Sequence, residues 1–296
     1  MVTPGLLLVD KPAGITSHDV VSKVRRLLGT RKVGHAGTLD PMATGLLVLG
    51  IESGTKLLTF IVGKDKTYEA TIRLGSSTVT DDSEGDILET AAQEKIAGVS
   101  QQSILSSIAK LTGVIQQKPS AVSAIKVDGE RAYTRVRAGE EVNLPSREVT
   151  VSRFEVVGGI RFAEDYIDLD VAVDCSSGTY IRALARDLGH DLGVGGHLTQ
   201  LRRTRVGEFY VAAGYNFESS DEVTIIELAE AAKTTLPYLE ISNQYEIDLR
   251  HGKRITGMVD MPSAAIFDGQ LVAVVEAAGP NSLKSLVVFS LGESNV

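Results

Sequence analysis

The sequence predicts an α+β protein with a mixed, mainly antiparallel central sheet, flanking helices and a small β module at the C-terminal end. Strand-like and helix-like runs follow one another without the strict alternation that a doubly wound parallel sheet requires. Runs over 147–157 and 166–175 are close enough to form an antiparallel hairpin. After Pro237 the chain becomes short-stranded and rich in turn signals. We therefore expect two domains, a larger one over 1–238 and a smaller one over 239–296.

The N-terminal elements begin with a strand and an amphipathic helix. An apolar run over 5–9 predicts a buried strand, which ends in a turn at Asp10-Lys11-Pro12. Thr16 or Ser17 can cap the helix that follows, and Gly29 can end it. Beyond this helix the patterns predict strands over 46–51 and 66–74, helices over 56–62 and 101–111, and a solvated acidic loop over 80–86.

The remaining elements alternate in the same irregular way. We expect a strand over 123–127, a basic helix over 131–138, the hairpin named above, a helix that opens at Gly178, a basic strand over 201–205 and a helix over 221–233.

Composition narrows the class of protein. The chain has 296 residues, of which 43% are hydrophobic and 23% charged, as is ordinary for a soluble globular protein. No apolar run is long enough to span a bilayer and no signal-peptide pattern follows Met1, so we expect a cytoplasmic protein without membrane contact. The one cysteine, Cys175, excludes an intramolecular disulfide and is expected to be buried.

The formal net charge of −8 is unevenly distributed. Residues 1–68 carry nine Lys/Arg against five Asp/Glu, whereas 211–296 carry five against twelve. Local basic patches, rather than net charge, decide whether a protein holds phosphates. Any single basic cluster is typical of a solvated face. The candidates for nucleic-acid contact are Lys11, Arg31, Lys32, Arg131, Arg202, Arg203 and Arg205.

Residues 34–41 read Gly-His-Ala-Gly-Thr-Leu-Asp-Pro and place Asp40 on a short loop ahead of an apolar run. Pro41 fixes its own φ and biases Asp40 away from helical angles. A carboxylate on such a loop suits catalysis. Taken alone, however, an ordinary turn before Pro41 is the simpler interpretation.

Other segments strengthen the catalytic interpretation. Lys66-Thr67-Tyr68 places an aromatic side chain on a strand, and Tyr180 and Arg182 lie two residues apart at the start of a helix. Leu201 opens a basic strand. Each of these alone is typical of packing or of surface. Together with 10–17 and 34–41, and in this order, they resemble the bacterial tRNA pseudouridine synthases of the TruB family over about residues 5–210.

The resemblance implies a pseudouridine synthase fold with a PUA-like C-terminal module, although the likeness is looser beyond about residue 244. It makes Asp40 the catalytic aspartate and Arg182 the arginine that pairs with it. Tyr68 and Tyr180 become active-site tyrosines, Leu201 an apolar residue of the pocket, and His35 the residue that helps to displace the target base.

The implied reaction is isomerisation of uridine 55 in the T-loop of tRNA, after the base has been flipped out of its stack. A carboxylate suffices for it, as nucleophile or as base, and the residues do not choose between these roles. No cofactor and no metal are expected. The expected partner is the T-arm stem-loop of tRNA, without a guide RNA or a protein partner, and the chain is expected to be a monomer.

Three alternatives remain open. The chain could be a non-catalytic RNA-binding protein that keeps the pocket, or a synthase that depends on a guide RNA and partner proteins. A carbohydrate enzyme with Asp40 in an acid pair has little support, because no second carboxylate has a similar loop context. Whether the acidic C-terminal module contacts RNA is also open.

Overall fold

The computed structural model describes residues 2–120, 126–127, 130–131, 144–218 and 222–289. The chain divides into two compact units. Unit 1 comprises Met1–Pro41, Gly45–Gly63 and Val206–Val296, and unit 2 comprises Met42–Thr44 and Lys64–Arg205. Within the described ranges, no helix combines the length and the apolar character needed to cross a membrane.

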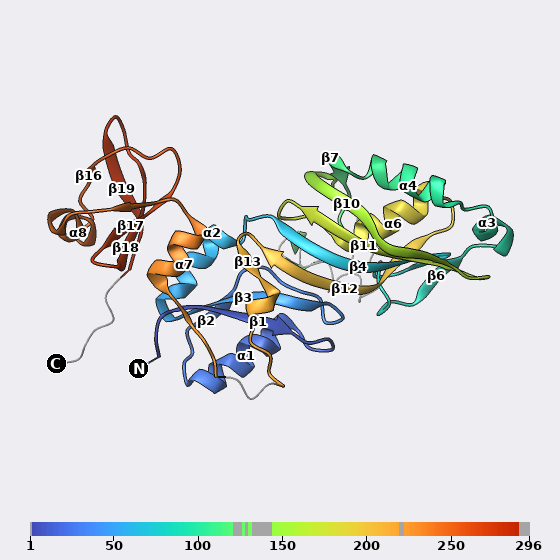
Figure 1. Ribbon diagram of the computed structural model, residues 1–296, viewed down its shortest axis with the longest axis horizontal. Helices are drawn as coiled ribbons and strands as arrows, with labels where there is room; N and C mark the ends of the chain where they lie inside the picture. Colours follow the sequence, from blue (N-terminus) through green and yellow to red (C-terminus); the bar gives the residue numbers. More distant parts are fainter. Residues whose placement is uncertain (1, 121–125, 128–129, 132–143, 219–221, 290–296) are drawn as a thin grey trace. The chain divides into compact units, whose positions relative to one another are not determined.

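The first sheet of unit 1 is built on β1 (Gly5–Lys11) and β3 (Thr44–Ile51), which pair antiparallel along the whole of β1 (Figure 1). β14 (Ile226–Glu227) pairs with β1, and β2 (Val33–His35) pairs with β3. Both strands are almost continuously apolar because both faces of the sheet are covered. Leu6, Leu8, Leu46 and Val48 belong to one hydrophobic cluster, and Leu7, Val9, Leu47 and Leu49 belong to the other.

Helix α1 (Ser17–Leu28) covers one of these faces with Val20, Val21 and Val24. Thr16 caps it in a capping box with Asp19, and Gly29 ends it in the left-handed conformation with φ 67°. The cap signals therefore predicted this helix correctly. The helix expected over 56–62 is instead a 3-10 helix, η1 (Glu52–Leu57), followed by the short α2 (Leu58–Ile61).

The C-terminal part of unit 1 contains a five-stranded sheet in the order β15-β17-β18-β19-β16. β15 runs parallel to β17, and the other pairs are antiparallel. Its strands are β15 (Tyr238–Glu240), β16 (Ile255–Thr256), β17 (Ser263–Phe267), β18 (Gln270–Ala277) and β19 (Ser282–Val288). The turn-rich pattern after Pro237 thus predicted β structure correctly. The helices here are α7 (Leu228–Thr235) and α8 (Asn243–Arg250), and the linking segment holds β13 (Phe209–Tyr210) and η2 (Val211–Ala213).

Helix α7 begins seven residues later than the expected helix over 221–233, because Ile226 and Glu227 pair with β1 as strand β14. Residue 221 lies outside the described residues. Pairing with a distant strand overrides the local helical pattern at this point.

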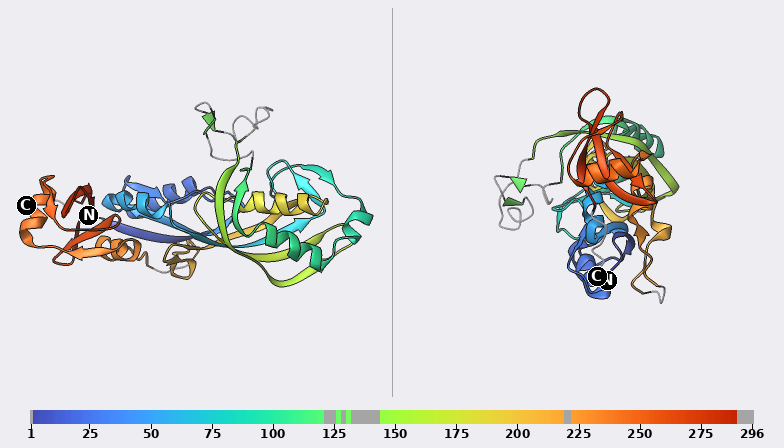
Figure 2. Two further views of the ribbon diagram at one scale, coloured as in Figure 1. Left: turned by 90° about the horizontal axis from the view of Figure 1, so that it is seen from above. Right: turned by 90° about the vertical axis from the view of Figure 1, so that its left-hand side faces the viewer.

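The strands of unit 2 follow the order β12-β4-β11-β10-β7 (Figure 1). Figure 2 shows the same ribbon from two further sides. β4 and β11 pair antiparallel without interruption, from Lys66 opposite Cys175 to Leu74 opposite Ile167. β11 and β10 form the expected hairpin, which is longer than predicted and contains two register shifts. The strands are β4 (Lys66–Leu74), β7 (Gly113–Gln117), β10 (Arg147–Phe162), β11 (Ile167–Cys175) and β12 (Gly196–Val206).

Helices α4 (Gln101–Lys110) and α6 (Ile181–Asp191) contact each other and pack on β10 and β4 respectively. The turn at Gly178, where φ is 87°, precedes α6, so this helix starts three residues later than expected. Of the basic helix expected over 131–138, Arg131 lies in a strand and the rest lies outside the described residues. The smaller elements are α3 (Gln93–Ala97), β5 (Ser76–Thr78), β6 (Ile87–Thr90), β8 (Lys126–Val127) and β9 (Glu130–Arg131).

Candidate active site

Asp40 lies half-buried in the loop between β2 and β3 of unit 1. β2 ends at His35 opposite Leu49, and the backbone of Ala36 still donates to Val48 O at 2.9 Å. Gly37 then turns the chain with φ 99°, a conformation that favours glycine. The sheet therefore fixes the entrance to the loop.

The residues on both sides of Asp40 are held by the first residue of α1 and by the segment before this helix. The hydroxyl of the fully buried Ser17 donates to Leu39 O at 3.1 Å and accepts from Leu39 N at 2.8 Å. Pro41 O accepts from Gly14 N at 2.9 Å and from Lys11 Nζ at 3.1 Å. The backbone that presents Asp40 is thus fixed directly before and directly after it.

Lys11 is fully buried, and its ammonium also donates to Pro12 O at 2.9 Å and to Ile15 O at 2.7 Å. These carbonyl contacts support a structural role for Lys11. The RNA contact expected of Lys11 from the sequence stays a prediction. Arg203 on β12 is also almost completely buried.

His35 is half-buried, and its ring meets the ring of His18 on the first turn of α1. The ring centroids are 5.6 Å apart and the planes are nearly perpendicular, at 82°. Edge-to-face geometry of this kind is favourable between aromatic rings. The neighbour on α1 therefore helps to define the orientation of His35.

Tyr68 and Leu201 are buried on two adjacent strands of unit 2. Tyr68 lies on β4 opposite Val173 of β11, and Leu201 lies on β12. Side chains alternate between the two faces of a strand, and Tyr68 shares the buried face of β4 with Ala70, Ile72 and Leu74.

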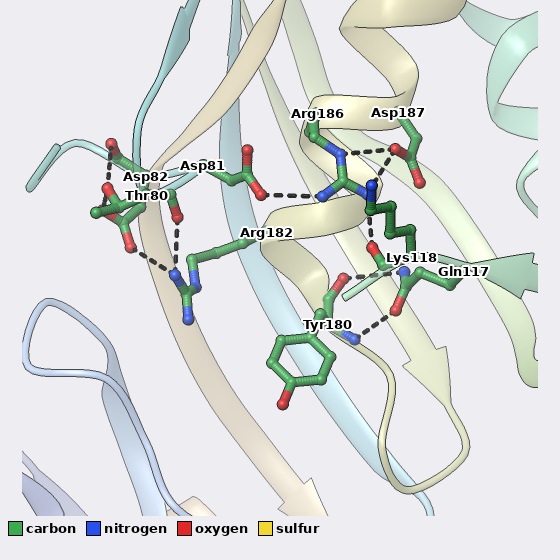
Figure 3. Close-up of polar contacts among 9 residues, drawn as sticks. All are labelled: Thr80, Asp81, Asp82, Gln117, Lys118, Tyr180, Arg182, Arg186 and Asp187. Atoms are coloured by element: carbon green, nitrogen blue, oxygen red, sulfur yellow. Dashed lines mark hydrogen bonds and ion pairs between the residues drawn. The ribbon is translucent and has the colours of Figure 1, made fainter. Parts of the chain in front are cut away.

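Tyr180 is the N-cap residue of α6, and Arg182 follows in the first turn. In Figure 3 the side chain of Arg182 points to the loop that follows β5. Its Nη1 donates to Thr80 O at 2.7 Å and lies 3.5 Å from Asp82 Oδ2. The side chains of Arg182 and Asp82 are only 6% and 3% exposed, so this ion pair is shielded from solvent.

The loop over 80–86 was expected to be solvated, and this expectation is wrong for Asp81 and Asp82, which are buried. Asp81 Oδ2 lies 3.2 Å from Arg186 Nη1, one helical turn beyond Arg182 (Figure 3). Burial raises the pKa of Asp81, although the charge of Arg186 opposes this shift. The sequence signal that could have found this network is a pair of arginines four residues apart on a helix of otherwise mostly apolar residues, because buried arginines need anionic partners.

The other basic candidates lie in different settings. Arg31 and Lys32 are exposed between α1 and β2, and Lys32 Nζ lies 3.5 Å from Glu52. Arg202 is half-buried on β12 with Nη1 3.4 Å from Thr44 Oγ1. Arg205 Nε donates to Thr67 Oγ1 at 2.8 Å. The backbone of Arg131 belongs to β9, and its side chain lies outside the described part of the structure.

Among the described residues, no three His, Cys, Asp or Glu side chains gather in a way that could hold a metal ion. Cys175 is buried on β11 opposite Lys66, and burial raises the pKa of its thiol to about 11. A thiol with such a pKa is a poor nucleophile at neutral pH. Cys175 is therefore not a candidate for the chemistry of the site.

Comparison with known proteins identifies the family of this chain. The family model described as "TruB family pseudouridylate synthase (N terminal domain)" matches residues 25–181, and "tRNA pseudouridylate synthase B C-terminal domain" matches 182–239. The tRNA pseudouridine synthase B of Leifsonia xyli subsp. xyli is 56% identical over 99% of both chains. That of Arthrobacter sp. (strain FB24) is 52% identical over 97% of this chain and 96% of its own.

A solved structure agrees with these relatives. The structure of a Cbf5-Nop10-Gar1 complex matches with a TM-score of 0.70 and 25% identity over 97% of this chain and 84% of that chain. Fold and sequence together define a pseudouridine synthase, an isomerase that acts on uridine in RNA. The chain belongs to the TruB family of these enzymes.

Proposed function

We propose that this enzyme converts uridine 55 in the T-loop of tRNA into pseudouridine, with Asp40 as its catalytic residue. Membership of the family supports the reaction, and the relatives named tRNA pseudouridine synthase B support tRNA as the substrate. One observation carries the role of Asp40: its loop is held at Leu39 by Ser17 and at Pro41 by Gly14 and Lys11. Catalytic groups need such fixed positions.

The reaction breaks the bond between ribose C1′ and uracil N1, turns the base, and joins C1′ to C5. C5 loses a proton and N1 gains one, so the product is an isomer of the substrate. Asp40 starts this sequence either as a nucleophile or as the base that removes the proton from C2′. A substrate deuterated at C2′ distinguishes the two roles, because only the base mechanism gives a primary isotope effect on the removal of this proton.

The other residues of the proposed site support Asp40 and the base. The guanidinium of Arg182 orients the carboxylate of Asp40. Tyr68 stacks on the uracil and takes part in the loss of the C5 proton, while Tyr180 and Leu201 line the pocket. His35 fills the space that the flipped base leaves, which offsets part of the few kcal/mol that flipping costs.

RNA binding is assigned to the exposed Arg31 and Lys32, together with Arg131, Arg202 and Arg205. Residues 239–296 are proposed as a separate PUA-like module. The enzyme would act in the cytoplasm as a monomer and without a guide RNA. The second candidate is a guided synthase, because the similar Cbf5 chain was solved in a complex with Nop10 and Gar1. Activity of the purified chain on an unmodified tRNA transcript would exclude this candidate.

The decisive variant is Asp40→Asn, which keeps the size of the side chain and removes its charge. With tRNA tritiated at C5 of uridine, tritium release should vanish while tRNA binding persists. Asp260→Asn, an exposed site in the C-terminal part, serves as the matched control and should release tritium normally. Normal release by Asp40→Asn would overturn the catalytic assignment and favour a non-catalytic RNA-binding role for the residue.

A further inference from the structure

The segment over 116–119 has no role in the proposed mechanism, yet it contains a buried amide next to a proposed active-site residue. Gln117 is the last residue of β7 and is 1% exposed. Its side chain makes two hydrogen bonds with the backbone of one residue, Tyr180 (Figure 3). Nε2 donates to Tyr180 O at 3.1 Å, and Oε1 accepts from Tyr180 N at 2.8 Å.

This double contact fixes the residue at which α6 begins. Tyr180 is the N-cap residue of α6, and its side chain makes no capping hydrogen bond. Buried backbone groups at a helix start need partners from elsewhere. Gln117 supplies a donor and an acceptor in the way that a neighbouring strand would, so the start of α6 is fixed to the sheet.

A second contact holds the same two elements together. Arg186, one turn after Arg182 on α6, donates from Nη2 to Lys118 O at 2.7 Å. β7 is itself fixed by its antiparallel register with β10, in which Gln117 lies opposite Arg147. The end of β7 therefore holds α6 at two points, Tyr180 and Arg186, and Arg182 lies between them in the sequence.

We propose that Gln117 is a positioning residue of this enzyme, which sets the place of the Tyr180 ring and of the Arg182 guanidinium through the backbone of Tyr180. Figure 3 shows that the ring of Tyr180 points away from Gln117, so the amide holds only the backbone and leaves the ring free for substrate. This inference rests on the proposed function of Tyr180 and Arg182. Displacement of a catalytic group by about 1 Å can lower turnover by about 100-fold.

Gln117→Met tests the inference, because methionine keeps the length of the side chain and removes both hydrogen bonds. With a T-arm stem-loop as substrate, we expect kcat to fall at least about tenfold while KM changes less than about threefold. Gln117→Glu keeps the acceptor for Tyr180 N and loses the donor to Tyr180 O, so its kcat should lie between those of the wild type and Gln117→Met. Gln116→Met is the matched control, because Gln116 is the exposed neighbour on the same strand, and it should retain normal kcat.

A purely structural role would lower the melting temperature of the Gln117 variants and leave the kcat of the folded enzyme unchanged, which would overturn the inference. An equal loss of kcat in Gln116→Met would also overturn it. If Gln117→Met does not fold, the kcat of Gln117→Glu tests the inference: a kcat below that of the wild type supports it, and an unchanged kcat overturns it. Asp40→Asn is assayed in parallel: if it is inactive while the Gln117 variants turn over normally, only this inference fails. If Asp40→Asn is active, the proposed function fails.

Discussion

The hydroxyl of Ser17 makes two hydrogen bonds with the backbone of Leu39, twenty-two positions away in the sequence. It donates to the carbonyl oxygen and accepts from the amide, so it satisfies both polar groups of the residue directly before Asp40. Ser17 is also the first residue of α1, whose apolar face packs on the first sheet of unit 1. The loop that carries Asp40 is thus held by the same helix start that the capping signals predicted.

Ser17→Ala should therefore reduce both stability and turnover. The variant leaves a buried amide and carbonyl without this partner, which should lower the free energy of unfolding by about 1–3 kcal/mol. We expect kcat to fall roughly tenfold, because the backbone beside Asp40 gains freedom. Urea denaturation and tritium release measure the two effects. Ser22→Ala, an exposed position on the same helix, should change neither, and an unchanged kcat in Ser17→Ala would contradict the proposed role of the contact.

Lys11→Met should behave as a core substitution rather than as the loss of an RNA contact. The ammonium donates to three carbonyl oxygens, so we expect the free energy of unfolding to fall by roughly 2–4 kcal/mol. Each lost phosphate contact makes the slope of log K against log salt shallower by nearly one. The slope for Lys11→Met should equal that of the wild type, whereas Lys32→Met should make it shallower. A shallower slope of log K against log salt in Lys11→Met would instead support the RNA contact expected of Lys11 from the sequence.

Asp82→Asn should lower turnover by roughly 10- to 100-fold with little change in RNA affinity. The substitution removes the buried negative charge that lies 3.5 Å from Arg182 Nη1, so the guanidinium becomes less well fixed. Single-turnover kinetics and filter binding separate the two effects. Asp86→Asn is the matched control, since Asp86 is exposed on the same loop and should retain normal activity. Weakened binding with normal turnover would show that Asp82 does not act through Arg182.

The local patterns of the sequence predicted those elements whose partners are their own neighbours. β4 has the bounds expected for 66–74 because its alternation of buried and exposed residues is regular. α1 begins at a capping box and ends at Gly29, both of which are short-range signals. The hairpin of β10 and β11 follows from two long runs with a short connection.

The misplaced elements and residues depend on contacts between positions far apart in the chain. Because Ile226 pairs with Leu6, α7 begins later in the chain than expected, and no local sequence pattern near residue 226 predicts that strand. The sequence around Asp81 and Asp82 is typical of a solvated loop. In the folded chain these two carboxylates form ion pairs with Arg186 and Arg182, which lie about one hundred residues later. The sequence around Lys11 is typical of a surface lysine, but its ammonium is buried and donates to the carbonyl oxygen of Pro41. For the candidate site, the motifs predict Asp40, Tyr68 and Arg182, and these roles stay predictions. The contacts of Gln117 with Tyr180 and of Asp82 with Arg182 could be recognised only from the folded chain.

Lys66 should make stability depend on pH in the weakly alkaline range. Burial and the charge of Arg203 lower the pKa of Lys66 from its ordinary value of 10.5 to about 8 in the folded protein. Between these two values the unfolded chain binds the proton and the folded protein does not, so the contribution of Lys66 to stability rises as the pH rises from about 8 to 10.5. Urea denaturation at pH 7 and pH 9.5 should show a gain of about 1–2 kcal/mol in the wild type relative to Lys66→Met. The control variant is Lys95→Met, because Lys95 is exposed, and it should show the same pH dependence of stability as the wild type. If the free energy of unfolding changes by the same amount in the wild type and in Lys66→Met between the two pH values, the lowered pKa of Lys66 is refuted.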